Sequence, residues 1–141
     1  LYEWTAVSED QKTAVGMLAQ KLTAANAPYA CYHAAGLAPE KCYHFYNQPM
    51  KHDIREFGDL INTAAPIHIR KDSLIHHAVA KFVKMDGETE DYLVYGDGLM
   101  QAGVNLKQAF SATGYNSEVR YFPDFASRMY FMEEQDESGV L

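Results

Sequence analysis

Two Cys-x-His motifs, which begin at Cys31 and Cys42, carry the residue types that bind zinc. If the two motifs lie on facing strands of a hairpin, the two-residue period of a strand puts Cys31 and His33 on one face and likewise Cys42 and His44 on one face. Thiolate and imidazole are the usual ligands of a tetrahedral zinc ion. These four side chains are therefore the candidate metal ligands. Our principal prediction is that the protein binds no cofactor, and zinc at these four residues is the alternative.

Two other interpretations of the motifs stay open. Ligands separated by one residue lie close together on a flat strand and are hard to arrange tetrahedrally, which favours buried thiols and half-exposed histidines. In an oxidising compartment, Cys31 and Cys42 could instead form a disulfide.

The same segment is unusually rich in aromatic residues. Tyrosine presents a large apolar face with a polar tip, which is why it is enriched in binding patches. The candidate partner-binding residues are Tyr29, Tyr32, Tyr43, Phe45 and Tyr46. The alternative is that alternate members fill the core, because a half-buried sheet selects the same residue types.

No complete catalytic motif is present, and we predict no catalytic residues. The turn Gly96-Asp97-Gly98 has the look of a phosphate-binding loop, but a strand-to-helix turn in which Asp97 caps the helix explains it better. The six histidines have no nucleophile at a local spacing that would make a catalytic pair. An active site assembled from distant residues, such as His68, His76, Asp97 and Arg120, stays open. Without a complete motif, we lean towards a protein that is not an enzyme.

The run from Asp97 to Gly114 resembles the central helix of flavin-dependent nitroreductases. The resemblance covers only this short run, and the arginine-rich amino-terminal motif of that family has no counterpart here. The resemblance therefore implies no flavin-binding residue in this chain.

Charge and composition restrict the classes of partner. The chain has 141 residues, and its 12 Lys and Arg against 19 Asp and Glu give a net charge of −7. No basic cluster exceeds the pair Arg70-Lys71, so nucleic-acid binding is disfavoured and a basic protein is the better electrostatic partner. A homo-oligomer stays open. The longest stretch without a charged residue, Leu22 to Pro39, is too polar to span a bilayer, and we expect a soluble chain without a transmembrane segment or targeting peptide.

Periodicity and turn residues predict the elements that position these side chains. Ser8-Glu9-Asp10-Gln11 has the pattern of a capping box, and it predicts a helix that ends before Asn26. A hairpin then joins 29–33 to 41–46, unless a helix starts at Pro39. Further helices are expected at 52–64 and 98–113, and further strands at 1–7, 67–70, 76–85, 92–95, 118–122 and 128–132. Ile75, Val79 and Phe82 would also suit a helix, but Asp86-Gly87 favours a hairpin there.

The predicted fold class is α+β: an antiparallel sheet of about five to seven strands packed by about three helices. We expect a single domain over residues 1–132, followed by an acidic C-terminal tail at 133–141. The predicted function is a non-catalytic protein-binding or assembly domain, such as an inhibitor, an immunity-type protein, an adaptor or a subunit of a larger particle. The alternative is a small enzyme or ligand-binding domain centred on the Cys/His segment. A ferredoxin-like regulatory domain shares only the expected alternation of elements.

Overall fold

The computed structural model describes residues 1–24, 30–56, 62, 68–107, 118–119 and 122–135. The chain divides into two compact units, which are described one at a time. Unit 1 consists of Leu1–Gln48, Thr89–Gln108 and Phe122–Leu141, and unit 2 of Pro49–Glu88 and Ala109–Tyr121.

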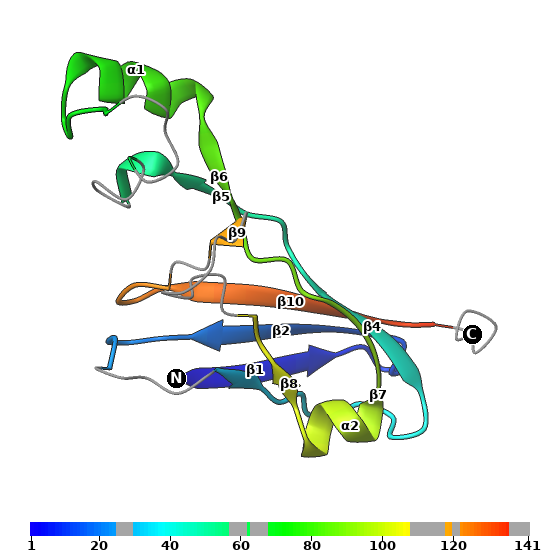
Figure 1. Cartoon of the computed structure of the whole chain (residues 1–141). Coiled ribbons are helices and arrows are strands. Elements are labelled where there is room, and N and C mark those ends of the chain that lie inside the picture. Colours follow the sequence, from blue (N-terminus) through cyan, green and yellow to red (C-terminus); the bar gives the residue numbers. More distant parts are fainter. Residues whose placement is uncertain (25–29, 57–61, 63–67, 108–117, 120–121, 136–141) are drawn as a thin grey trace. The chain divides into compact units, whose positions relative to one another are not determined.

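Unit 1 is built on a five-stranded antiparallel sheet in the order β1-β2-β10-β4-β7 (Figure 1). The strands are β1 (Tyr2–Val7), β2 (Thr13–Ala19), β10 (Ser127–Glu134), β4 (Cys42–Asn47) and β7 (Asp91–Tyr95). The last strand in the sequence, β10, lies at the centre of the sheet. A short helix, α2 (Gly96–Gln101), follows β7, and a two-stranded sheet pairs β3 (Cys31–Tyr32) with β8 (Val104–Asn105).

The helix predicted after Ser8 is wrong, because β1 and β2 form a hairpin there. Ser8 closes the turn: its backbone N–H donates to the Thr13 carbonyl, and its hydroxyl donates to the Asp10 carboxylate. Ser and Asp side chains stabilise turns by the same local bonds that cap helices. The following strand is apolar on both faces, with Leu18 buried and Met17 half-buried, so its residues also fit a helical stripe.

The hairpin predicted between 29–33 and 41–46 is also wrong in its pairing. The strand predicted at 41–46 is confirmed as β4, but β4 pairs with β10 and β7, whereas Cys31 and Tyr32 pair with β8. The turn predicted at Asp86-Gly87 likewise does not join two paired strands, since β7 pairs with β4. The predicted strands at 1–7 and 128–132 are confirmed as β1 and β10.

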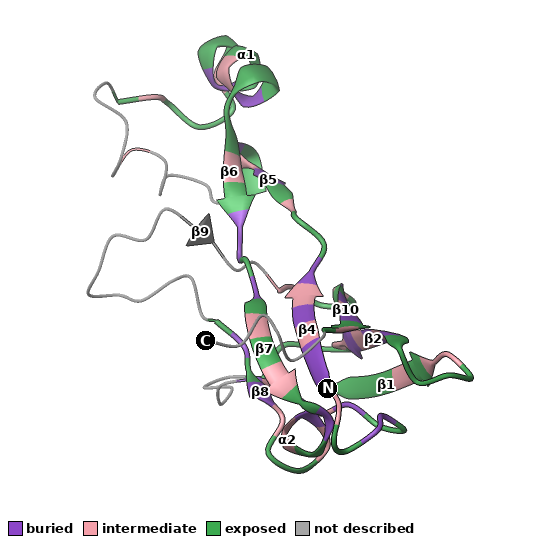
Figure 2. Cartoon of the chain, turned by 90° about the vertical axis from the view of Figure 1, so that its right-hand side faces the viewer, coloured by how far each residue is buried: buried purple, intermediate pink, exposed green. Residues whose placement is uncertain are grey.

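The core of unit 1 lies on one face of the five-stranded sheet, where aromatic rings pack together. The Phe45 ring lies 5.8 Å from Tyr32 and 5.1 Å from Tyr130, measured between ring centroids. All three side chains are almost completely buried. Figure 2 shows the resulting pattern, with buried residues along β4 and an alternation along β7.

Unit 2 contains a three-stranded sheet and one helix. The strands β5 (Lys51–Asp53), β6 (Lys84–Gly87) and β9 (Glu118–Val119) pair in the order β5-β6-β9. Asp53 accepts hydrogen bonds from Arg55 and Lys84, and these contacts hold the pKa of its carboxyl far below the usual range of an aspartate. This carboxylate therefore fastens β5 to β6.

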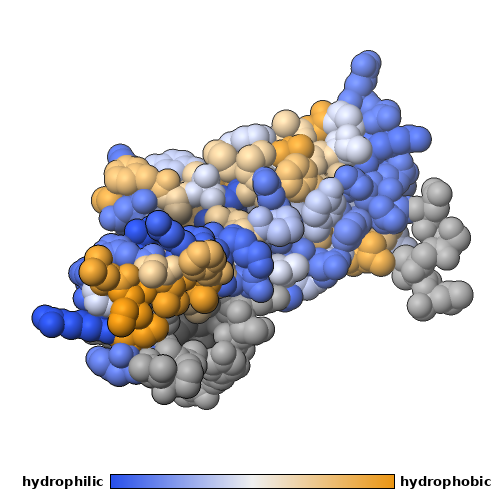
Figure 3. Space-filling view, turned by 90° about the horizontal axis from the view of Figure 1, so that it is seen from above, coloured by the Kyte–Doolittle hydropathy of each residue, from blue (hydrophilic) through white to orange (hydrophobic). Residues whose placement is uncertain are grey.

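Residues 74–82 form a helix, α1 (Leu74–Phe82), where a strand was predicted from 76 to 85. The Ser73 hydroxyl caps the helix by accepting from the His76 N–H, and this local signal outweighs the β-branched content. Figure 3 shows hydrophobic surface on α1, where Leu74, Ile75 and Phe82 are exposed.

Two other predicted helices are shorter or absent. The one predicted at 98–113 is helical only over α2, because Gly103 has a φ of 70° and β8 follows at once; residues 108–113 lie outside the described part. The helix predicted at 52–64 is absent from the described residues: 52–53 belong to β5, and 54–56 form one 3₁₀ turn. Residues 57–61, 63 and 64 lie outside the described part.

Two predicted strands are also shorter or absent. Of the strand predicted at 67–70, residues 68–70 are irregular, and residue 67 lies outside the described part. Of that at 118–122, β9 covers 118–119, Phe122 is irregular and 120–121 are not described.

The fold class prediction is therefore wrong. In the described residues the chain is mostly antiparallel sheet with two helices, rather than an α+β sheet packed by about three helices. Part of the predicted acidic tail is strand, since β10 continues to Glu134. The single-domain boundary at residue 132 stays a prediction. No helix among the described residues has the length and apolar character needed to cross a membrane.

Candidate functional site

The structure separates the two Cys-x-His motifs. Cys31 Sγ lies 3.8 Å from Nε2 of His33, whose Nδ1 lies 3.4 Å from a Glu3 carboxylate oxygen. Cys42 is buried in β4, which is not the partner strand of Cys31. Both cysteines are free thiols. Across the residues that the structure describes, no group of three or more His, Cys, Asp or Glu side chains is placed to hold a metal ion.

The Cys31 thiol has a raised pKa, first because the side chain is partly desolvated and second because the Glu3 carboxylate lies near it. Since the thiolate is the nucleophile, we expect Cys31 to react with iodoacetamide at pH 8 more slowly than a free cysteine does. Mass spectrometry of tryptic peptides would measure the rate. The Cys31→Ser variant, in which only the buried Cys42 remains, is the control and should stay unlabelled. A rate equal to or above that of free cysteine would contradict the prediction.

On the opposite side of the sheet from the core, His44 and Tyr46 each bind a carboxylate. Nε2 of His44 lies 2.8 Å from Oδ1 of Asp91, and the Tyr46 hydroxyl donates to Oε1 of Glu133 at 2.7 Å. The bond to Glu133 raises the pKa of Tyr46. The Tyr46 ring also stacks on Phe131, with 5.4 Å between centroids. His44 is therefore paired with a carboxylate and not with the other predicted zinc ligands.

The predicted partner-binding aromatics lie mostly in the core. Tyr32, Tyr43 and Phe45 have no exposed surface, Tyr46 is half-buried, and Tyr29 lies outside the described residues. A side chain without exposed surface cannot contact a partner. The arrangement therefore matches the alternative in which alternate residues of the strand fill the core.

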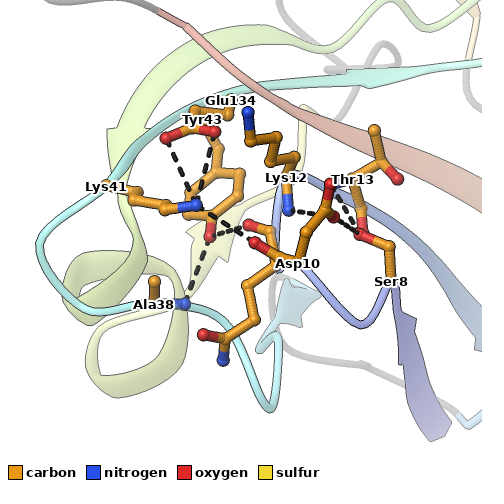
Figure 4. A network of polar contacts seen from close by, with 9 residues as sticks. Ser8, Asp10, Lys12, Thr13, Ala38, Lys41, Tyr43 and Glu134 are labelled. Carbon is orange, nitrogen blue, oxygen red and sulfur yellow. Dashed lines mark hydrogen bonds and ion pairs between the residues drawn. The ribbon is translucent and has the colours of Figure 1, made fainter.

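The Tyr43 hydroxyl joins three segments of unit 1 (Figure 4). It donates to the Gln11 carbonyl at 2.7 Å and accepts from the Ala38 N–H at 3.1 Å. Beside it, Nζ of Lys41 lies 3.2 Å from the Asp10 carbonyl and 3.3 Å from the Glu134 carboxylate. The network ties the β1–β2 turn to the loop before β4 and to the end of β10.

We expect Tyr43→Phe to lower the free energy of unfolding by about 1–3 kcal/mol, because the buried Ala38 N–H that donates to the hydroxyl would be left without a partner. Urea denaturation would measure the loss. Tyr46→Phe is the matched control, since its hydroxyl bonds Glu133 on the solvent-facing side. Equal stabilities of the two variants would contradict the structural role of the Tyr43 hydroxyl.

The turn at Gly96-Asp97-Gly98 uses its amides within the protein. The N–H of Gly96 donates to the Lys41 carbonyl at 2.9 Å, and that of Asp97 donates to the Pro39 carbonyl at 3.1 Å. The Gly98 N–H donates to the Asp97 carboxylate at 2.7 Å. The helix begins at Gly96, so Asp97 lies in its first turn rather than at the predicted cap. These three N–H groups are therefore occupied and do not form a phosphate-binding turn.

Sequence reasoning missed the outer face, which we define as the side of the five-stranded sheet opposite the aromatic core. Strand register and alternation assign its members. They are Tyr2, Trp4 and Ala6; Thr13, Val15, Met17 and Ala19; Ser127, Met129, Phe131 and Glu133; Cys42, His44 and Tyr46; and Asp91, Leu93 and Tyr95. The available signal was the nearly continuous apolar run in β2 and β10, which fits strands with two apolar faces.

The fold and these surfaces define a predominantly antiparallel β domain. The family described as "Glycosyl hydrolase family 36 C-terminal domain" matches residues 1–132. The chain belongs to this family.

Nine chains of solved structures also match. One is an α-galactosidase from Lactobacillus brevis, 21% identical, with a TM-score of 0.49; the match covers 96% of this chain and 12% of that chain. The present chain thus spans about an eighth of that enzyme. No curated protein matches the chain.

The family corrects the predicted function. A domain of a glycosyl hydrolase family is neither an inhibitor nor an adaptor, so the prediction of a binding or assembly protein is wrong. The Cys/His alternative has no support either, since the described residues hold no cluster that could bind a metal. The helix that resembled the nitroreductases is only six residues long. The predictions on cofactors and on a basic protein partner stay predictions.

Proposed function

We propose that the chain works as the C-terminal domain of a carbohydrate-active enzyme, a family 36 glycosyl hydrolase in which the domain is one part of a longer polypeptide. The observation that supports this most directly is the family match over residues 1–132. The aromatic core and the hydrogen bonds of Tyr43 suit a rigid accessory domain. In this proposal the domain supports an enzyme whose substrate is a glycoside.

An antibody raised against the 141-residue chain would test the proposal in extracts of the source cells. We expect it to detect a polypeptide several times longer than the chain and to precipitate activity against aryl glycosides. Antibody blocked beforehand with the purified chain is the control and should precipitate no such activity. Detection of a 141-residue product alone, without precipitated activity, would refute the proposal.

A further inference from the structure

Strands β2 and β10 carry apolar side chains on both faces. In β10, Met129 and Phe131 point to the outer face, between Tyr130 and Met132, which point into the core. In an antiparallel sheet with one face in water, the residues of that face are usually polar. Nearly continuous apolar strands are typical of a sheet that is covered on both sides. The sequence of these strands therefore fits a covered outer face.

The apolar part of this face is compact. We name it the Trp4 patch; its members are Trp4, Val15, Met17, Tyr46, Met129 and Phe131. Trp4, Met17 and Met129 are direct neighbours across three strands, and so are Val15, Phe131 and Tyr46. Trp4 is 44% and Met129 41% exposed. Trp4 and Met129 are thus open to solvent in the chain by itself, and the other four members are half-buried.

The composition of the outer face is that of a protein interface. Aromatic residues and Met are enriched at the centre of such interfaces, whereas Lys is depleted there. Five of the six members of the Trp4 patch, all except Val15, are of these favoured types, and the outer face as defined contains no Lys. Glu133, His44 and Asp91 lie beside the patch, where they provide a polar rim.

We propose that the Trp4 patch packs against another domain of the same glycosyl hydrolase polypeptide. This inference rests on the proposed function, because the occupant is the part of the enzyme that the C-terminal domain would accompany. Five strands about 4.8 Å apart and about 20 Å long give a face of roughly 400 Å². That area fits one side of an interface between domains of one chain, of about 600–1,500 Å² in total. This flat area of the whole sheet face is about half of the roughly 800 Å² of accessible surface that each partner of a stable complex between separate chains buries, which puts the face at the small end for such a complex.

Methionine oxidation tests the proposal in the intact polypeptide. Dilute hydrogen peroxide oxidises exposed methionines, and peptide mapping by mass spectrometry gives the rate at each position. We expect Met17 and Met129 to react about tenfold more slowly in the intact enzyme than in the 141-residue chain alone. Two methionines serve as controls. Met132 is completely buried and should react slowly both in the intact enzyme and in the chain alone. Met100 lies on α2, outside the outer face, and should react at the same rate in the two proteins.

A second measurement uses a charge placed in the patch. Met129→Glu should lower the melting temperature of the intact enzyme, because the carboxylate would be buried against the other domain, and should leave that of the 141-residue chain unchanged. Leu22→Glu is the matched control, since Leu22 is exposed outside the strands and should tolerate the charge in both proteins.

Two results would overturn the inference. Equal oxidation of Met17 and Met129 in the intact enzyme and in the chain alone would show an open patch. A dimer of the 141-residue chain in light scattering, with both methionines protected in it, would show that a second copy is the occupant. Either result would leave the proposed function unaffected. That function is refuted by a different result, in which the antibody detects no polypeptide longer than the 141-residue chain.

Discussion

Replacing Phe45 by alanine should lower the free energy of unfolding by about 3–5 kcal/mol, the range for removal of a fully buried aromatic ring. Phe45 has no exposed surface and packs between Tyr32 and Tyr130, with Tyr92 6.4 Å away between centroids. The deletion removes apolar area and leaves a cavity whose aromatic walls are held by the sheet. Urea denaturation monitored by circular dichroism would measure the loss.

The chain offers a control of the same chemistry for this variant. Phe125 lies in the turn before β10 and is 74% exposed. Phe125→Ala removes the same atoms from a site in water, so we expect a change within about 0.5 kcal/mol. Similar losses for the two variants would show that the Phe45 ring is not in the core.

Gly96→Ala should lower the free energy of unfolding by about 2–3 kcal/mol, as expected for overpacking against rigid backbone. A Cβ atom on Gly96 would lie 2.1 Å from the Ala38 carbonyl oxygen and 2.9 Å from its carbon. The backbone would have to move apart, which would stretch the bond from the Gly96 N–H to the Lys41 carbonyl. Thermal unfolding would detect the loss, and the amide signals of the loop before β4 should shift in NMR spectra.

Gly98 gives the control two residues along the same helix. A Cβ atom there would meet only the end of the Val94 side chain, at 3.2 Å, which can adjust. Alanine also reduces the entropy of the unfolded chain, by about 0.4–1 kcal/mol where the native conformation accepts it. We therefore expect Gly98→Ala to be neutral or slightly stabilising. If Gly98→Ala were as unstable as Gly96→Ala, the loss of stability in both variants would come from helix geometry and not from the contact with Ala38.

The sequence located several strands but did not determine their partners. β1, β4 and β10 were predictable because their aromatic and β-branched residues suit a pleated surface. Pairing was not, since β4 lies between β7 and β10, both distant in the sequence, and no local pattern specifies such neighbours. The hairpin at Ser8 was missed because a side chain that caps a helix can equally close a turn.

The candidate site was predictable only in part. The burial of Tyr43 and Phe45, two residues apart on β4, follows from the period of two, and a core role for alternate aromatics was weighed as the alternative to a binding surface. The separation of Cys31 from Cys42 depended on the pairing of β3 with β8, which the sequence does not reveal. The outer face was missed because its apolar residues in β2 were interpreted as the stripe of a helix.

The central position of β10 also determines when unit 1 can form during synthesis. Until residues 127–134 have left the ribosome, β2 and β4 each lack the neighbour that completes their hydrogen bonding. Contacts between segments so far apart in the chain form slowly, and unpaired strand edges promote aggregation meanwhile. A nascent chain that ends before Ser127 would therefore depend on chaperones that shield β2 and β4, and its release from them should await the final strand.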